Sequence, residues 1–526
     1  MKRFYILLGV LLSLLTATSC SFLEEYSQDK SYVRSYTDLD ELLLGDGYMP
    51  IGVSNYHIGI SYDLLLEAPW YYPYIHLMGD EVSENIRQDA SSAAIADARE
   101  LYFGYYTWQP EVGINVTGNA LGEEDKDWNN IYRHINVVNM ILAAIDDQTA
   151  DNADDALEVR RVRGEARFLR AAWYFTLVNL YAQPYVPDQA ETTPGVPLKA
   201  TEYIEDKLYT RNSVAEVYRQ ILDDLGGAEE DLSQTPRKSV FRADITAVEL
   251  LTSRVYLYMQ QWEKCCEYAR KVIARKPELQ DLNTMAAGQI FLTGDLNELI
   301  FTMGSGGLRS SISNLKLDFG ISPDLFAAYD DPDDLRLEYF VKYNETDQAP
   351  EYVKEGGVTK LNRRTPSSNF AFRTAEAYLN LAEAAACNGE QEVAVEALDE
   401  LRRHRIRSSA FHPTTLSGSD LITFIRDERR RELCLEGHRW FDLRRYMVST
   451  VLPYTKSITH SYTTYEYVYD PSSWSYTYLP MQTVEYRLEE NDAAYTLPIP
   501  HEVLEYDTEI SNNPRPQRPV VNTITY

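Results

Sequence analysis

The feature that most constrains the fold is a series of long stretches in which apolar residues recur every three or four positions. Two such stretches span 128–145 and 162–180, and a third opens with Ser213 and Glu216 at the spacing of a capping box. A capping box satisfies free backbone N–H groups at the start of a helix. The three-to-four spacing places apolar side chains on one face of a helix. The chain is therefore predicted to be mainly α-helical.

Two further regions are predicted to form helical hairpins of one design. In each, two helical segments flank a short break: 243–259 and 263–274 in the first hairpin, and 371–387 and 391–405 in the second. Alanine recurs where the helices of a pair would cross, and small side chains let two backbones approach closely. Paired antiparallel helices are the unit of tetratricopeptide-like repeats. We expect a scaffold of tetratricopeptide-like helical pairs.

Long irregular segments separate the helical regions, near 48–110, 283–370 and 454–495. They are rich in Gly, Pro, Ser and aromatic residues, and loops of this length in compact domains are usually functional or disordered. Their aromatic content argues against disorder. We therefore expect one domain over 36–526, in which the helical scaffold carries long aromatic-rich loops and a few short strands.

Local patterns refine this expectation. Aromatic residues alternate with other residues over 465–469 and 474–478, which predicts a β-hairpin with one aromatic face. Interleaved charges over 426–445 predict a salt-bridged helix with an i,i+4 pair between Asp427 and Arg431. An acidic run predicts a turn followed by a helix start, with a calcium site as the alternative; its members are Asp330, Asp331, Asp333 and Asp334.

The N-terminal residues have the layout of a bacterial lipoprotein signal. Two basic residues precede an apolar stretch over 4–15, and small residues lead to Cys20, as in a secretory signal that is cut before a cysteine. The apolar stretch is too short to span a bilayer as a helix. We expect a signal peptide over 1–19 and a tether over 20–35 that is acylated at Cys20. A cleaved signal with an incidental cysteine is the alternative.

Charge and cysteine usage exclude several functions. Lys and Arg number 50 against 80 Asp and Glu, for a net charge of −30. Nucleic-acid binding depends on clustered cations, so no nucleic-acid partner is expected. The other cysteines form no C-x-x-C motif, which argues against a disulfide framework or a zinc site. We expect them to be buried helix residues: Cys265, Cys266, Cys387 and Cys434.

No motif for catalysis or cofactor binding occurs in the sequence. The 8 histidines contain no H-E-x-x-H, and a P-loop, a dinucleotide-binding glycine motif and a nucleophile elbow are all missing. We expect no metal ion, no cofactor and no enzymatic activity. With 80 acidic residues, a glycosidase carboxylate pair facing a cleft stays an alternative.

Aromatic clusters in the first loop region are candidates for ligand binding. Sugar rings present C–H faces that pack on flat aromatic rings, while neighbouring Asn and Arg side chains bond the hydroxyl groups. Packing within the loops is the alternative role for each ring. The candidate ligand-binding residues are Trp70, Tyr71, Tyr72, Tyr74, Asn85, Arg87, Tyr102, Tyr105 and Trp108.

Five segments follow the lipoprotein start in a characteristic order: WNNIYRHINVVN at 128–139, RGEARFLRAAWYF at 163–175, FRTAEAYLNLAEA at 372–384, ERRRELCLEGHRWFDLRR at 428–445 and PIP at 498–500. Together they resemble the SusD/RagB-like family of Bacteroidetes outer-membrane lipoproteins, over nearly the whole chain. The resemblance implies an α-helical fold with tetratricopeptide-like pairs. It also implies capture of nutrients at the cell surface by a protein that is not an enzyme.

The resemblance further implies a partner. Proteins of this family cap a SusC-like TonB-dependent transporter and hand it glycans or, in some members, peptides. Glu24 and Glu25, just after Cys20, resemble the signal that sends such lipoproteins to the outer face of the outer membrane. No ligand-binding residue carries over by motif, because the family's binding residues fall in variable loops, here between Trp70 and Trp108 and around 303–314.

We therefore expect a lipid-anchored, surface-exposed lipoprotein of the outer membrane that captures extracellular oligosaccharide and delivers it to a SusC-like transporter. The alternatives are the same scaffold binding peptides, a secreted glycosidase, and a structural partner subunit without a ligand.

Overall fold

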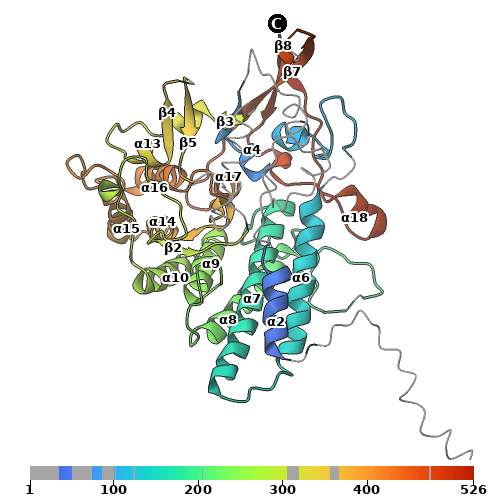
Figure 1. Cartoon of the computed structure of the whole chain (residues 1–526), viewed down its shortest axis with the longest axis vertical. Coiled ribbons are helices and arrows are strands. Elements are labelled where there is room, and N and C mark those ends of the chain that lie inside the picture. The colour runs from blue at the N-terminus through green and yellow to red at the C-terminus, as the bar shows by residue number, and fades with distance from the viewer. Residues whose placement is uncertain are drawn as a thin grey trace, which may run out of the picture.

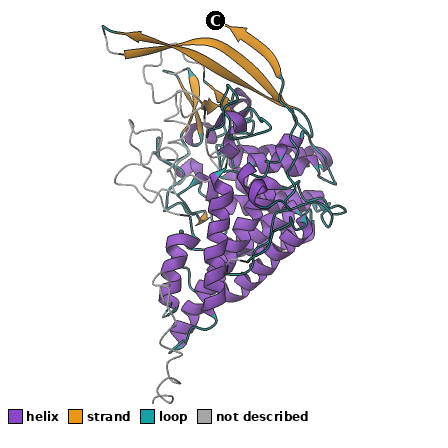
Figure 2. Cartoon of the chain, turned by 90° about the vertical axis from the view of Figure 1, so that its right-hand side faces the viewer, coloured by secondary structure: helices purple, strands orange, loops and turns teal. Residues whose placement is uncertain are grey.

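The computed structural model describes residues 33, 35–49, 74–85, 100, 102–121, 125–203, 205–304, 319–346, 348–355, 366–472 and 475–526. Long helices fill the lower part of the molecule in Figure 1, and most strands lie at the upper end. Turned by 90°, the same molecule shows one long sheet across the top of the helical body (Figure 2).

The predicted amphipathic stretches form three neighbouring helices. α6 (Lys126–Ile145) packs on α7 (Ala153–Tyr181), and α7 packs in turn on α8 (Val214–Leu232). The first described helix, α2 (Tyr36–Leu42), continues into a short π-helix, η1 (Leu43–Gly47), and contacts α6 and α7. The prediction of a helical scaffold from residue spacing is confirmed.

Both predicted helical hairpins are also confirmed. The first consists of α9 (Ile245–Tyr258) and α10 (Trp262–Arg275), and the second of α14 (Thr374–Cys387) and α15 (Gln391–Arg403). α10 packs against α14, so two hairpins that are distant in sequence lie side by side (Figure 1). Gly389, with φ of 82°, makes the turn within the second hairpin.

Side chains at the helix starts explain where the long helices begin. Ser213 and Glu216 form the predicted capping box at the start of α8. Asp125, Asn152 and Asp244 accept hydrogen bonds from the first free N–H groups of α6, α7 and α9. Replacing such a cap by alanine typically costs about 1 kcal/mol.

The predicted salt-bridged helix over 426–445 is instead two helices. α16 (Gly418–Glu432) and α17 (Arg439–Met447) are separated by a turn in which Leu435 has φ of 57° and Gly437 has φ of 79°. A helix cannot pass through residues in the left-handed region, so the chain changes direction here. The predicted pair with Asp427 is wrong as well, because Arg431 pairs with Glu428 at 2.8 Å.

Short elements complete the framework. Further helical segments among the described residues are α4 (Tyr74–Leu77), η2 (Leu282–Thr284), α12 (Pro323–Ala327), α13 (Arg336–Tyr339), η3 (Ser368–Phe370), η4 (Ala493–Tyr495) and α18 (His501–Tyr506), and residues 102–106 are helical as well. Three two-stranded antiparallel sheets pair β1 (Val82–Glu84) with β3 (Phe319–Ile321), β2 (Leu299–Phe301) with β6 (Phe372–Arg373), and β4 (Val341–Asn344) with β5 (Ala349–Tyr352).

The segment expected as a loop near 454–495 contributes two of the three strands of the largest sheet among the described residues. β7 (Ile458–Asp470) pairs antiparallel with β8 (Ser475–Leu488), and the register sets Tyr467 opposite Tyr478 and Tyr469 opposite Tyr476. The hairpin predicted from aromatic alternation is therefore confirmed. A third strand, β9 (Val520–Thr525), pairs with the outer edge of β8.

The buried apolar side chains form one cluster that extends through the helical pairs. Cys265 and Cys266 are buried in α10, as expected, whereas Cys434 lies in the turn after α16 and Cys387 is half-buried. Across the described residues, none of the helices combines the length and apolar character needed to cross a membrane.

Candidate functional site

The structure places three of the predicted ligand-binding aromatics in the protein core. Tyr74 and Tyr105 stack on each other with ring centroids 4.0 Å apart and are 3% and 5% exposed. Trp108 has no exposed surface, and its indole N–H donates to the carbonyl of Met78 at 3.0 Å. Rings packed in this way have no free face for a sugar, so burial argues against ligand contact for these three.

The other candidates fall into two groups. Tyr102 and Asn85 are half-buried, and Asn85 lies over Gly320, where a methyl group would come within 2.6 Å of the Asn85 amide nitrogen. These two stay candidates. The remaining candidates, together with the lipid-attachment residue, lie outside the described residues: Cys20, Trp70, Tyr71, Tyr72 and Arg87.

Residues that border three stretches outside the described residues, one within the expected loop 48–110 and two within 283–370, meet at one place. Met49 precedes the stretch 50–73, Gly304 precedes 305–318, and Ser367 follows 356–365. A methyl group on Gly304 would lie 3.3 Å from Met49 Sδ and 4.0 Å from Ser367 Cβ. The N–H of Ser367 also donates to Thr302 Oγ1 at 3.0 Å.

On the other side of the same junction, His76 bonds to Asn369, which connects the end of the first stretch to the end of the third. We call the junction formed by Met49, Ile75, Met303, Gly304, Ser367 and Asn369 the loop base.

A small pocket opens at the loop base. Its volume is about 60 Å³, and its walls come from α4, α7, α9 and the turn between α16 and α17. The lining mixes aromatic rings with polar groups in similar numbers. The aromatic residues are Phe175, Tyr258, Phe370, Phe372 and Phe441, and the polar ones are Thr176, Asn179, Arg254, Asn369, Glu436 and His438. A pocket of this size holds a few water molecules but not a sugar ring, so it can form only the floor of a larger site.

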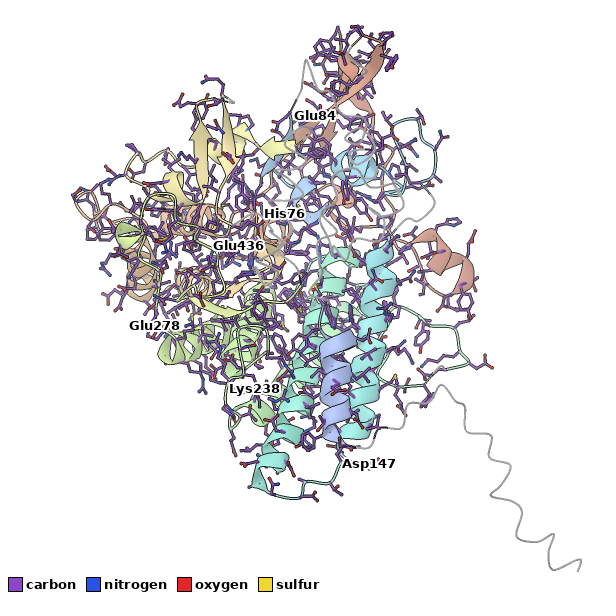
Figure 3. All side chains as sticks on the ribbon, viewed as in Figure 1. His76, Glu84, Asp147, Lys238, Glu278 and Glu436 are labelled. Carbon is purple, nitrogen blue, oxygen red and sulfur yellow. The ribbon has the colours of Figure 1, made fainter. Side chains whose placement is uncertain are left out.

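The polar groups of this pocket do not supply proton chemistry at neutral pH. Burial lowers the pKa of His438 well below its ordinary value, and nearby Arg254 and Arg429 lower it further. Burial likewise lowers the pKa of His76 to about 4. Both rings are therefore neutral at pH 7. Figure 3 shows His76 and Glu436 on neighbouring elements in the middle of the molecule.

Behind the pocket, buried ion pairs fix the turn between α16 and α17. Arg373 contacts Glu298, Glu432 and Glu436, and Arg405 bonds to Glu298 and Glu432 at 2.8 Å each. All five side chains are fully buried. Burial alone would raise the pKa of Glu432, but Arg405 and Arg373 hold it below its ordinary value. The structural network expected in this charged region is confirmed, and it holds the turn that lines the pocket at the loop base.

The acidic run at 330–334 is a turn that leads into α13, as predicted. Asp334 is buried and pairs with Arg336 at 2.7 Å, and Asp333 pairs with Arg407 at 3.1 Å. Within the described residues, no group of three or more His, Cys, Asp or Glu side chains could hold a metal ion.

Sequence reasoning missed the residues that build the loop base. They are uncharged residues from four separate parts of the chain, and no local spacing distinguishes them from ordinary core residues. The local signals were two glycines in the left-handed region: Gly304, within the loop base, with φ of 81°, and Gly437, which packs beside Ile75 and Asn369, with φ of 79°.

Comparisons with known proteins agree with this architecture. A family model described as "SusD family" matches residues 346–515, and one described as "Starch-binding associating with outer membrane" matches residues 70–257. A SusD-like protein P2 from Formosa agariphila is 26% identical over 392 residues, which covers 64% of this chain and 74% of that protein.

Solved structures share the fold over nearly the whole chain. A SusD superfamily protein from Bacteroides thetaiotaomicron has a TM-score of 0.66 at 21% identity and covers 91% of this chain and 100% of that one. A SusD-like carbohydrate binding protein from Bacteroides vulgatus has a TM-score of 0.63 at 20% identity, over 90% of this chain and 97% of that one. At these identities the likeness concerns the fold. With the two family models and the curated relative, it shows that the chain is a SusD/RagB-like family protein.

Proposed function

We propose that this protein is a cell-surface lipoprotein that binds extracellular oligosaccharide and delivers it to a SusC-like TonB-dependent transporter. The observation that carries the proposal is the match of residues 70–257 to the family model described as starch-binding and associated with the outer membrane. That range includes the predicted aromatic region between Trp70 and Trp108. A carbohydrate-binding protein from Bacteroides vulgatus with the same fold supports the same ligand class.

The geometry of the loop base suits binding rather than catalysis. The charged groups that line the pocket at the loop base are held in ion pairs, Glu436 with Arg373 at 2.6 Å and Arg254 with Glu376 at 2.6 Å. The nearby histidine rings are neutral, since burial lowers the pKa of His76 to about 4. A floor that is formed before the ligand arrives lowers the entropy cost of ligand binding.

Attachment to the outer membrane and the transporter partner rest on sequence features. Cys20 follows a signal-like segment, and the described helices offer no membrane span. A net charge of −30 gives no electrostatic attraction to an anionic membrane surface. Acyl chains on Cys20 would then provide the attachment.

The test is retardation in native affinity gels that contain one polysaccharide each, with the processed chain carrying Cys20→Ser. We expect retardation by one glycan class, and relief of that retardation in Trp70→Ala and in Tyr102→Ala. Tyr506→Ala is the matched control, because Tyr506 is 88% exposed on α18, outside the predicted loops. Circular dichroism verifies that each variant is folded.

Each other outcome assigns a different function. Binding of peptides that weakens as salt is added would favour the peptide-binding alternative, because an acidic chain prefers basic segments and salt screens their attraction. Release of reducing sugar from a retained glycan would favour a glycosidase. A chain that binds neither glycan nor peptide would contradict the proposal. For the partner, co-purification with a TonB-dependent transporter from native membranes is the expected result.

A further inference from the structure

A cavity of about 180 Å³ lies between α16, α17 and residues 452–454. It shares no lining residue with the pocket at the loop base. A buried cavity of roughly 150 Å³ holds a benzene ring, so this one has room for a single six-membered ring. The candidate aromatic region between Trp70 and Trp108 and the loop base do not line it, whereas Tyr454, at the start of the expected loop near 454–495, does.

The walls of this cavity are fixed by hydrogen bonds. Arg426, on α16, donates to the carbonyl of Leu452 at 2.7 Å and to Ser449 Oγ at 3.2 Å. The N–H of Tyr454 donates to the carbonyl of Tyr446 at 3.0 Å. These bonds hold the segment 449–454 against both helices. The cavity is therefore formed before any ligand arrives, which favours binding.

The cations at the cavity are already neutralised. Arg426 pairs with Glu383 at 3.3 Å, and Arg439 pairs with Asp80 at 2.8 Å. Both carboxylates are buried. Glu383 and Asp80 have other cation partners, but breaking either pair would take the counter-ion from an arginine whose side chain is 10% exposed or less, and removing one partner of a buried pair is costly. An anionic ligand would have to compete with these pairs, so the cavity does not suit one.

The groups that can still contact a ligand in this cavity are one aromatic ring and the side-chain oxygens of two residues, which can accept hydrogen bonds. The side chain of Tyr454 is 43% exposed and lines the cavity. Asp427 is exposed beside it, and its expected partner Arg431 pairs with Glu428 instead. Thr423, also exposed, donates its hydroxyl to Ser419 and keeps its oxygen lone pairs free to accept. This combination matches a ring that has apolar C–H faces and hydroxyl groups at its rim.

We propose that this cavity is a second carbohydrate-binding site, which takes one sugar ring. Tyr454 packs against a C–H face of the ring, and Asp427 accepts hydrogen bonds from two neighbouring hydroxyl groups. This proposal rests on the proposed function only in the choice of carbohydrate as the ligand class. With this site the protein would bind a glycan at two separate points. Two weak binding events on one linked ligand give a higher overall affinity than either event alone.

Saturation-transfer difference NMR tests the site with a panel of glucose, galactose, mannose, xylose and N-acetylglucosamine on the processed chain carrying Cys20→Ser. We expect at least one sugar to receive saturation. In Tyr454→Ala its affinity should fall about tenfold, as expected for loss of an aromatic stacking surface. Asp427→Asn should weaken it about threefold or more, whereas Tyr454→Phe should retain most of it.

Tyr203→Ala is the control, because Tyr203 is 58% exposed and lies outside the cavity. Both tested side chains are exposed, so the variants should fold.

The site is refuted if no sugar of the panel binds, or if the affinity of the bound sugar is unaffected by both Tyr454→Ala and Asp427→Asn. Affinity gels with the same variants separate the two proposals. Failure of the unmodified protein to bind any polysaccharide refutes the proposed function, whereas retention of polysaccharide binding without a Tyr454-dependent sugar signal refutes only this site.

Discussion

Trp108 and His460 lie face to face in the core, with ring centroids 4.3 Å apart and ring planes at 23°. Tyr106 stacks on His460 as well, at 4.2 Å, so the imidazole is held between two aromatic rings. This contact joins the first aromatic region of the chain to the β7 strand. An aromatic residue that was a candidate for ligand contact thus holds two distant segments together.

The first prediction concerns acid stability and follows from this contact. Burial lowers the pKa of His460 to about 4, although its hydrogen bonds with the carbonyls of Tyr106 and Gly79 favour the protonated ring. An unfolded histidine titrates near ~6.5. The unfolded chain therefore binds a proton between pH 6.5 and 4 that the folded chain does not, and stability falls as pH falls through this window. The loss from this one ring is about 2 kcal/mol at pH 5.

Thermal unfolding at pH 7.5 and pH 5 measures this loss. At pH 7.5 the melting temperature of His460→Phe should be equal to or lower than that of the unmodified protein. Between pH 7.5 and pH 5 it should fall by less than that of the unmodified protein. His412 is exposed, and His412→Phe should leave the pH dependence unchanged. An identical drop in melting temperature for the unmodified protein and His460→Phe would contradict the prediction.

The second prediction is that another buried group, Glu81, makes folding stability fall as pH rises, which is opposite to the effect of His460, in nearly the same pH range. Glu81 is 2% exposed, one of its carboxylate oxygens has no hydrogen-bond partner among the described residues, and the other accepts the N–H of Leu435 at 3.0 Å. Burial and the neighbouring Asp80 raise the pKa of Glu81 to about 7. In the folded chain Glu81 binds a proton below pH 7, whereas in the unfolded chain it binds one only below about pH 4.5. The free energy of unfolding therefore decreases as pH rises from 4.5 to 7.

Glu81→Gln removes the charge and should therefore stabilise the protein at pH 8, by about 1–3 kcal/mol. The gain should shrink towards zero at pH 5, where the carboxyl is already protonated in the folded state. Urea unfolding at both pH values provides the measurement. A gain of equal size at pH 8 and pH 5 would show that the charge of Glu81 is not the cause.

The third prediction concerns the buried ion pairs. Arg373→Met would leave Glu298, Glu432 and Glu436 with one cation fewer in a fully buried site. Removing one partner of a buried pair typically costs about 3–5 kcal/mol. The control is Arg403→Met, because Arg403 pairs with Glu400 at the surface, where the two side chains are 49% and 39% exposed. Surface pairs contribute about 0–1 kcal/mol. Comparable urea midpoints for the two variants would contradict a stabilising role of the network.

The fourth prediction compares two glycines. A methyl group on Gly104 would lie 2.3 Å from the carbonyl oxygen of Val112, whereas one on Gly226, in the middle of α8, would meet nothing within 4 Å. Gly104→Ala forces the backbone to move and should destabilise the fold by about 1–3 kcal/mol. Gly226→Ala should stabilise it by about 0.5–1 kcal/mol, because alanine favours the helix. Opposite shifts in melting temperature are expected, and two shifts of the same sign would refute the comparison.

Helix positions were predictable because amphipathic spacing is local. The stripe over 128–145 and the capping box at Ser213 became α6 and α8 with boundaries close to those expected. The charged stretch over 426–445 failed as a single helix because its periodicity continues through the turn, where Leu435 adopts φ of 57°. A leucine in the left-handed region has no sequence signature, since it is held there by tertiary contacts.

The candidate site was less predictable than the fold. An aromatic side chain suits a core as well as a ligand, so the sequence could not separate Trp108, which has no exposed surface, from Tyr454, which is 43% exposed. The loop base joins residues from distant segments, such as Met49 and Ser367, and only the fold brings them together. The hairpin β7–β8 was visible in alternating aromatics, but the third strand β9 was not, because its pairing with β8 links segments separated by other elements.

The buried ion pairs also impose an order on folding. A chain made N-terminus first produces Arg336, Arg373 and Arg405 before Glu432 and Glu436. Until α16 and the turn after it are available, these three arginines have no complete set of counter-ions and must stay hydrated. The helical pairs α7–α8 and α9–α10 use partners close in sequence and can assemble without waiting. The C-terminal half of the core is therefore expected to close late and in a single step, only after residue 436 has emerged.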